Sequence, residues 1–302
     1  MFYVYNFTRG SRPELHPSSV AIRHPPSAVA AEAVGLDLGL LDSEALARLV
    51  EAWRRHPVLV VRGQDLAPEE QLAFSRSLGE LDLAPPFDVE NSALEGFAEI
   101  AVVSNIKRNG KPVGGLGDGE LSWHSDMTFV PSPPVACILH ARELPPAGGD
   151  TLFLNLRAAW RGLPDQLRRR VTSARIFHDR AYTSAGTLRK GAEEGQGTWH
   201  KVRITDPVSG EDSLLLGRRR NSRIACGESQ DDGDLLEELW LHADRSEFIY
   251  RHVWRPGDVL LWNNLVTMHR RDAFDTAARR LLHRTQIRRL HSRWEWQGAS
   301  AA

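Results

Sequence analysis

His124 and Asp126, two positions apart in the segment Trp-His-Ser-Asp at 123–126, are the residues of this chain best placed to do chemistry. On an extended backbone such a pair points to the same side, so one imidazole and one carboxylate can bind a single cation. A third ligand must come from another strand, and His269 ends the run WNNLVTMH after a predicted strand. Two imidazoles and one carboxylate would occupy one face of an iron ion and leave its other coordination positions open.

Those open positions suit an oxoacid cosubstrate, which binds a metal through its 1-carboxylate and 2-keto oxygen and leaves one position for dioxygen. Its distal carboxylate would need a cation inside the protein, because a buried, unpaired carboxylate costs several kcal/mol. Arg280 lies at the start of an apolar strand and suits bidentate pairing with a carboxylate. Thr151, directly after Gly148-Gly149-Asp150, can add a hydrogen bond from its hydroxyl.

Two other functions are compatible with the same three ligands. A zinc-dependent hydrolase or lyase accepts two histidines and a carboxylate, although it has no need for Arg280 at a distance suited to a five-carbon diacid. A non-enzymatic barrel that binds a metal or a metabolite is the other alternative, because a fold does not fix a function. Metal content, dependence on oxygen and release of succinate would separate the three.

The elements that must position these residues are mainly short strands. A buried strand is predicted at 57–62, and further β-rich runs stand at 100–104, 135–141, 151–154, 174–178, 213–216, 248–254, 259–262 and 281–287, separated by turns rich in Pro and Gly. Helices are predicted after Asp42, where Leu46, Leu49, Val50 and Trp53 fall on one face, after Pro68, and at 234–242. This pattern predicts a mainly β protein with flanking helices, built as a jelly-roll-like double sheet.

We expect residues 1–302 to form one domain. Residues 1–33 are predicted to be an irregular N-terminal arm with at most one strand, and residues 290–302 a frayed tail. The Gly-rich, polar stretch 182–199 is too long for a simple turn and is interpreted as a lid over the site. Arg218–Arg220 follow a predicted strand, and the sequence leaves open whether they line a pocket or form a solvated face.

Composition favours small-molecule chemistry in a reducing compartment. The formal net charge of −1 gives no general electrostatic reason to expect nucleic acid or an anionic membrane as a partner. Two cysteines in 302 residues are not a disulfide framework. Because the chain has neither a signal-peptide pattern nor a run of about 18 apolar residues, we expect a cytoplasmic protein.

The motifs WHSD, PPAGGDTLF, WNNLVTMH and ARRLLHRT, with HPVLVVRGQ near the front, together resemble the iron(II)/2-oxoglutarate-dependent taurine dioxygenase family, which includes 2,4-dichlorophenoxyacetate dioxygenase-like enzymes. The resemblance runs from about Val34 to Ile287. It implies a double-stranded β-helix, a jelly-roll or cupin-like barrel. It also makes a homo-oligomer reasonable.

The resemblance implies Fe(II) on His124, Asp126 and His269, with O2 as the oxidant. It implies 2-oxoglutarate on Thr151 and Arg280. Arg284 would lie near the far end of the site, where it would help bind the cosubstrate or an acidic substrate. The implied reaction couples oxidative decarboxylation of 2-oxoglutarate, to succinate and CO2, with hydroxylation or a related C–H oxidation of a small, anionic organic substrate.

The sequence departs from the family pattern at position 263 and keeps it at position 126, and the second observation bears on the type of reaction. Asn263 stands where the family usually has Asp before the second histidine, which changes the charge around the ligands more than the ligand set. Related halogenases replace the carboxylate ligand with a small residue. Because Asp126 keeps that carboxylate, hydroxylation or a related oxidation is favoured over halogenation.

Overall fold

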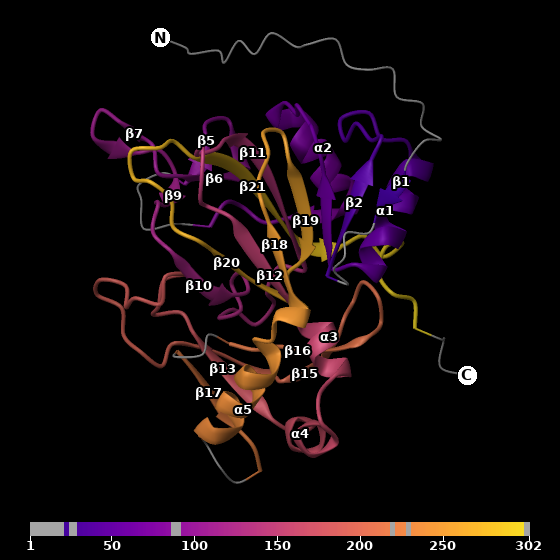
Figure 1. Cartoon of the computed structure of the whole chain (residues 1–302), viewed down its shortest axis with the longest axis vertical. Coiled ribbons are helices and arrows are strands. Elements are labelled where there is room, and N and C mark those ends of the chain that lie inside the picture. Colours follow the sequence, from indigo (N-terminus) through magenta and orange to yellow (C-terminus); the bar gives the residue numbers. More distant parts are fainter. Residues whose placement is uncertain (1–20, 24–28, 86–91, 218–220, 228–230, 299–302) are drawn as a thin grey trace.

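The computed structural model describes residues 21–23, 29–85, 92–217, 221–227 and 231–298. Two β-sheets lie at its centre, and a smaller group of strands and helices lies below them in the view of Figure 1. Arg218–Arg220, whose role the sequence leaves open, lie outside the described residues.

The larger sheet carries the N-terminal strands and the longest strands of the chain. Its order is β1 (Ala21–Arg23), β2 (Ala30–Val34), β3 (Val58–Val61), β19 (Val259–Asn263), β11 (Ala136–Glu143), β21 (Leu281–Leu290), β6 (Phe97–Ser104) and β5 (Ala93–Leu94), while β4 (Gly79–Leu81) pairs with β21 and β9 (Gly115–Leu116) with β6. The pairs β2–β3 and β6–β9 are parallel, and the other pairs of this sheet are antiparallel.

The smaller sheet is antiparallel throughout and faces the larger one. Its order is β10 (Leu121–His124), β20 (Thr267–Arg271), β12 (Thr151–Asn155) and β18 (Ile249–His252). Phe153 of this sheet packs in one apolar cluster with Cys137, Trp262 and Leu282 of the larger sheet. The predicted mainly β double sheet is therefore confirmed; among the described strands the two sheets share none, so they do not close into a barrel.

The remaining strands form three small sheets. They are β14 (Gly197–Lys201), β13 (Arg175–Asp179) and β17 (Ser222–Ala225); β15 (Arg203–Thr205) with β16 (Asp212–Leu214); and β7 (Lys107–Arg108) with β8 (Lys111–Pro112). The described helices are α1 (Ser43–Arg55), α2 (Pro68–Leu78), α3 (Leu156–Arg161), α4 (Asp165–Val171) and α5 (Gly233–Ala243), together with the 3-10 turn η2 (Ser246–Phe248). None of the helices described is long and apolar enough to cross a membrane.

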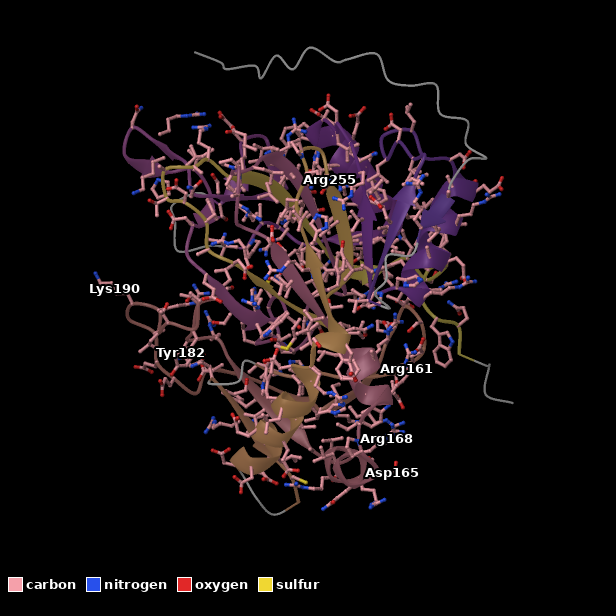
Figure 2. All side chains as sticks on the ribbon, viewed as in Figure 1. Arg161, Asp165, Arg168, Tyr182, Lys190 and Arg255 are labelled. Carbon is pink, nitrogen blue, oxygen red and sulfur yellow. The ribbon has the colours of Figure 1, made fainter. Side chains whose placement is uncertain are left out.

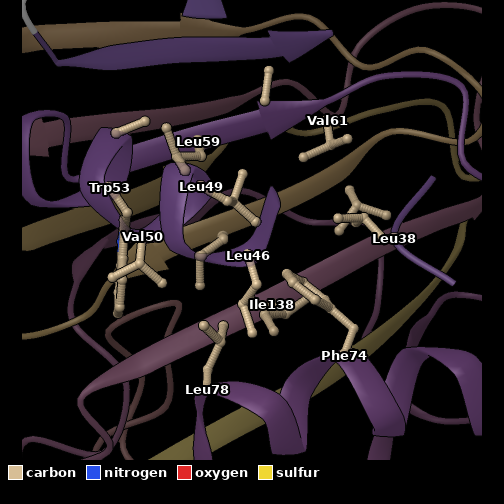
Figure 3. Close-up of a cluster of buried hydrophobic side chains, with 14 of the residues drawn as sticks. Leu38, Leu46, Leu49, Val50, Trp53, Leu59, Val61, Phe74, Leu78 and Ile138 are labelled. Atoms are coloured by element: carbon tan, nitrogen blue, oxygen red, sulfur yellow. The ribbon is translucent and has the colours of Figure 1, made fainter. Parts of the chain in front are cut away.

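Helix α1 forms where the sequence predicts it. The Asp42 side chain accepts a hydrogen bond from the Ala45 amide and so caps the helix at its first turn. Leu49 and Trp53 are buried on the inner face of the helix, where they join Leu59, Phe74 and Ile138 in the core cluster of Figure 3. This cluster covers the outer face of the larger sheet and holds β3, β19 and β11 in register.

Three expectations at the element level were wrong. Helices α3 and α4 were not predicted, because at six and seven residues they are too short to show a helical period, although Asn155 caps α3. Of the N-terminal arm the structure describes only residues 21–23 and 29–33, and these already contribute to two strands, β1 and β2, that pair into the larger sheet. The tail is not frayed from residue 290, because the Trp294 indole donates to the Ser77 carbonyl and the Trp296 amide to the Pro207 carbonyl.

Candidate functional site

His124, Asp126 and His269 come together between the two sheets. His124 ends β10 and is the direct cross-strand partner of His269 in β20, so their imidazole rings lie 4.3 Å apart between centroids. Asp126 follows two residues after the strand. Within the part of the chain that the structure describes, these three form the only group of acidic, histidine or cysteine side chains whose ligand atoms all lie within 4.8 Å of one another. All three are buried.

Backbone contacts fix how two of these side chains are presented. The Nδ1 atom of His124 lies 2.7 Å from the Ser122 carbonyl oxygen and so carries the proton, which leaves Nε2 as the lone-pair atom. The segment after His124 is held by Asn264, whose side-chain oxygen accepts from the Asp126 amide and whose NH2 group donates to the Asp126 carbonyl. The Ser125 hydroxyl donates to the Thr267 carbonyl of β20. The three ligands are therefore held in place by strand pairing and by hydrogen bonds.

The charges around Asp126 keep its carboxylate ionised. Burial alone would raise the pKa of Asp126, but the positive charge of Arg284, followed by the two histidines, outweighs burial and holds that pKa well below its ordinary value. The Nη1 atom of Arg284 donates to both carboxylate oxygens, at 3.1 and 3.0 Å. Burial lowers the pKa of His269, which is therefore neutral at pH 7. An ionised carboxylate and neutral imidazoles are the forms that bind a divalent cation, so this donor set fits iron(II).

Arg280 and Thr151 lie at one end of the same space. The Arg280 side chain is only 2% exposed, its Nε atom is buried without a hydrogen-bond partner, and among the described residues it has no acidic partner. Its guanidinium lies 5.9 Å from the ring centroid of Trp254, whose indole N–H donates to the Thr151 hydroxyl at 3.1 Å. Arg279, its neighbour, is exposed and pairs with Glu143.

The backbone conformation at positions 148 and 149 explains why glycine stands at both. Gly148 and Gly149 both adopt positive φ, and a Cβ atom on Gly149 would lie 3.3 Å from Arg280 Nε. The Gly149 carbonyl lies 3.5 Å from Arg280 Nη2. Burial, and then the like charge of Arg271, lower the pKa of Arg280 to about 9, so the guanidinium is charged at neutral pH.

Sequence reasoning missed several residues around Asp126. Cys137 Sγ donates to Asp126 Oδ2 at 3.3 Å, and the Gln286 amide donates to the same oxygen at 3.3 Å. Asn264 lies in the same motif as His269, WNNLVTMH, but no feature of the sequence alone was a reason to assign it a role. Strand alternation could have found Gln286, because it lies two positions after Arg284 and therefore on the same face of β21.

Among the hydrogen bonds of the described residues, Asn263, the departure from the family pattern, makes none to the side chains of His124, Asp126 or His269. Its amide group donates to Asp206 Oδ1 at 2.7 Å, and Asp206 also pairs with the buried Arg157. The hydrogen-bond network around position 263 therefore contains a carboxylate, but Asp206 supplies it instead of residue 263.

A small hollow opens beside His124. Thr128, His178 and Asn221 give it polar walls, and Phe129 and Leu216 give it apolar ones. The predicted lid begins close by, because the Ser122 amide, two residues before His124, donates to the Ser184 carbonyl. Figure 2 shows Tyr182 and Lys190 on this projecting loop, and residues 197–199 of the predicted lid belong to strand β14.

Comparisons with known proteins agree with this geometry. The family model described as "Taurine catabolism dioxygenase TauD, TfdA family" matches residues 21–286. Pentalenolactone F synthase of Streptomyces arenae is 32% identical over 262 residues, which cover 81% of this chain and 86% of that protein. The alpha-ketoglutarate-dependent 2,4-dichlorophenoxyacetate dioxygenase of Cupriavidus pinatubonensis is 32% identical over 276 residues, 86% of this chain and 94% of that one.

A solved structure gives the same result for the fold. The crystal structure of AAD-2 in complex with Mn(II) and N-oxalylglycine superposes with a TM-score of 0.73 at 28% identity, covering 89% of this chain and 97% of that one. The predicted jelly-roll architecture is thus confirmed, and the oxygenase is favoured over the zinc enzyme and the non-enzymatic barrel. The chain belongs to the taurine catabolism dioxygenase TauD, TfdA family and is an Fe(II)- and 2-oxoglutarate-dependent dioxygenase that uses O2.

Proposed function

We propose that His124, Asp126 and His269 are the iron ligands of this dioxygenase. The observation that carries the proposal is the convergence of one ionised carboxylate and two imidazoles, all buried, in a geometry fixed by the β10–β20 pairing. Iron bound there supplies the activation of dioxygen. The protein's own residues then have to orient the cosubstrate and the substrate and exclude water.

Thr151 and Arg280 are the proposed partners of the distal carboxylate of 2-oxoglutarate. The support is that Arg280 is buried and charged without an acidic partner among the described residues, and that it lies with Trp254 and the Thr151 hydroxyl at one end of the space between the sheets. A carboxylate at this point would satisfy the guanidinium by charge-assisted hydrogen bonds.

The primary substrate is proposed to be a small organic anion that approaches through the hollow beside His124. Arg284 adds a buried positive charge at the ligand set, which favours an anion bound nearby. The relative from Cupriavidus pinatubonensis is named for a carboxylate substrate, 2,4-dichlorophenoxyacetate. Succinate release compared between matched carboxylate and carboxamide compounds tests the charge preference; equal release from both would contradict it.

The remaining expectations are proposed together. The protein acts on small molecules in the cytoplasm as a single-domain homo-oligomer, without nucleic acid or a membrane as partner, and the loop 182–196 closes over the bound substrate. Light scattering on a sizing column measures the oligomeric state. Protection of the loop from proteolysis by cosubstrate plus substrate would support closure, and unchanged cleavage would count against it.

The first experiment is an anaerobic titration of metal-free protein with Fe(II) and 2-oxoglutarate, followed by the visible charge-transfer band of an oxoacid chelated to iron. We expect the band in the wild type and not in His269→Ala. His242→Ala is the matched control, because His242 is also a buried histidine but lies away from the site, where its Nε2 atom is 2.8 Å from the Ala159 carbonyl oxygen of α3. A band in both histidine variants would reject His269 as a ligand.

A further inference from the structure

We propose that Arg271 is a second cosubstrate-binding residue, which with Arg280 forms a two-arginine clamp on the distal carboxylate of 2-oxoglutarate. The inference rests on the proposed function, which places that carboxylate at Thr151 and Arg280. It adds a cationic residue to which neither the motifs nor the sequence reasoning gave a role.

Strand register brings Arg271 to this place. Arg271 is the last residue of β20 and is the direct cross-strand partner of Thr151 in β12. It stands two residues after His269, so its side chain leaves the strand on the same face as that histidine. Directly opposed residues of an antiparallel pair have Cβ atoms about 4.5–5.5 Å apart. The Arg271 side chain therefore begins beside the Thr151 hydroxyl.

The two guanidiniums share one aromatic ring. The guanidinium carbon of Arg271 lies 5.4 Å from the ring centroid of Phe274, and that of Arg280 lies 5.8 Å from the same centroid. The charge of Arg271 is also felt at Arg280, where it is one cause of the lowered pKa. Two buried positive charges thus lie at one end of the space between the sheets.

The hydrogen bonding of Arg271 is incomplete. Its Nη2 atom donates to the carbonyls of Leu116, at 3.0 Å, and Gly119. Its Nε and Nη1 atoms are buried and have no partner, and the side chain is 3% exposed. Asp118 is the only acid that stabilises its charge among the described residues, and it lies beyond ion-pair distance. Leaving such buried donors unsatisfied is unfavourable, because they have given up their hydrogen bonds to water.

One anionic group would resolve all of these features. A carboxylate between the two arginines offers acceptors to the unpaired N–H groups of both and neutralises one of the two positive charges. A purely structural role, anchoring the 116–119 loop, accounts for Nη2 alone. It leaves Nε and Nη1 unexplained.

The test compares two five-carbon oxoacids, 2-oxoglutarate and 2-oxovalerate, which lacks the distal carboxylate. Their Kd values are measured anaerobically on the Fe(II)-loaded protein by the charge-transfer band. We expect Arg271→Met to raise the Kd of 2-oxoglutarate roughly 10- to 100-fold and that of 2-oxovalerate by less than about 3-fold. Arg270→Met is the control, because Arg270 points to the other face and pairs with Glu120 and Asp272. It should change neither Kd.

Equal weakening of both oxoacids would assign Arg271 to the loop anchor and overturn the proposal, and so would unchanged binding of both. If Arg271→Met does not fold, Arg271→Lys decides: it keeps the charge with fewer donors, and we expect a smaller loss that is still selective for 2-oxoglutarate. Equal losses in the Lys variant overturn the proposal. If the wild type forms no band with either oxoacid, the proposed function itself is contradicted, and the Arg271 proposal, which rests on it, is contradicted as well.

Discussion

Replacing Arg280 with methionine should make the metal-free protein more stable and should weaken its binding of 2-oxoglutarate. Burial and the charge of Arg271 lower the pKa of Arg280 from its ordinary value to about 9. A difference of that size corresponds to roughly 4–5 kcal/mol of cost to the charged form. Since the folded protein releases this proton at lower pH than the unfolded chain, the stability contributed by this group rises only above about pH 9. The cost is fully present at pH 7.

Part of that cost is offset by the contacts of the guanidinium with the rings of Trp254 and Phe274. We therefore expect Arg280→Met, which keeps the apolar stem, to gain about 2–3 kcal/mol in the free energy of unfolding. For a chain of this size that corresponds to a Tm higher by roughly 3–5 °C. The Kd of 2-oxoglutarate should rise about 100-fold or more, because a buried charge-assisted partner is lost.

Differential scanning calorimetry of the metal-free proteins and the anaerobic 2-oxoglutarate titration measure the two effects. Arg279→Met is the matched control: Arg279 is the adjacent residue, exposed and paired with Glu143, and its loss should cost less than about 1 kcal/mol and leave the Kd unchanged. A metal-free Arg280→Met protein that melts below the wild type would refute the reasoning. It would mean that Arg280 already stabilises the metal-free fold, so its burial would not require a bound anion.

Three further predictions concern the proposed iron ligands and the elements that support them. Asn264→Ala removes the bonds that hold the Asp126 backbone and should weaken Mn(II) binding about 10- to 100-fold, measured by electron paramagnetic resonance; Asn263→Ala, also buried but bonded to Asp206, should lose stability without losing metal affinity. Arg284→Gln removes a positive charge that lowers the pKa of both Asp126 and His269, so acid should release half of the Mn(II) at a higher pH than in the wild type; an unchanged pH would show that this charge does not control protonation of the three side chains. Asp42→Ala should lower the free energy of unfolding by about 1 kcal/mol in urea without changing the Kd of 2-oxoglutarate, and a larger loss would mean that Asp42 does more than cap α1.

Sequence reasoning went furthest where one short pattern carries the information. The i, i+2 spacing of His124 and Asp126 on an extended backbone placed both side chains on one side, and the structure brings His269 to them. The position of the arginine within the motif selected Arg280 over Arg279. In the structure Arg280 is buried, whereas Arg279 is exposed and pairs with Glu143. Helix α1 was predictable because its apolar period and its cap agree.

What could not be predicted depends on pairings between distant segments. Arg271 gave no signal as a functional residue, because its importance comes from the β12–β20 register that sets it opposite Thr151. Asn264 gave none because its partner lies 138 residues earlier in the chain. Helices α3 and α4 are stabilised by burial of Trp160 and Val171 in the lower core more than by local sequence, so no periodicity showed them.

The bond between Asn263 and Asp206 has a consequence for how related sequences can vary. An aspartate at position 263 would set two buried carboxylates within hydrogen-bonding distance of each other, although only Asp206 is shown to pair with the buried Arg157. Positions 263 and 206 should therefore change together: a relative that carries Asp at 263 is expected to carry a donor or a neutral residue at 206. In an alignment of such relatives, the two columns would covary although 57 residues separate them.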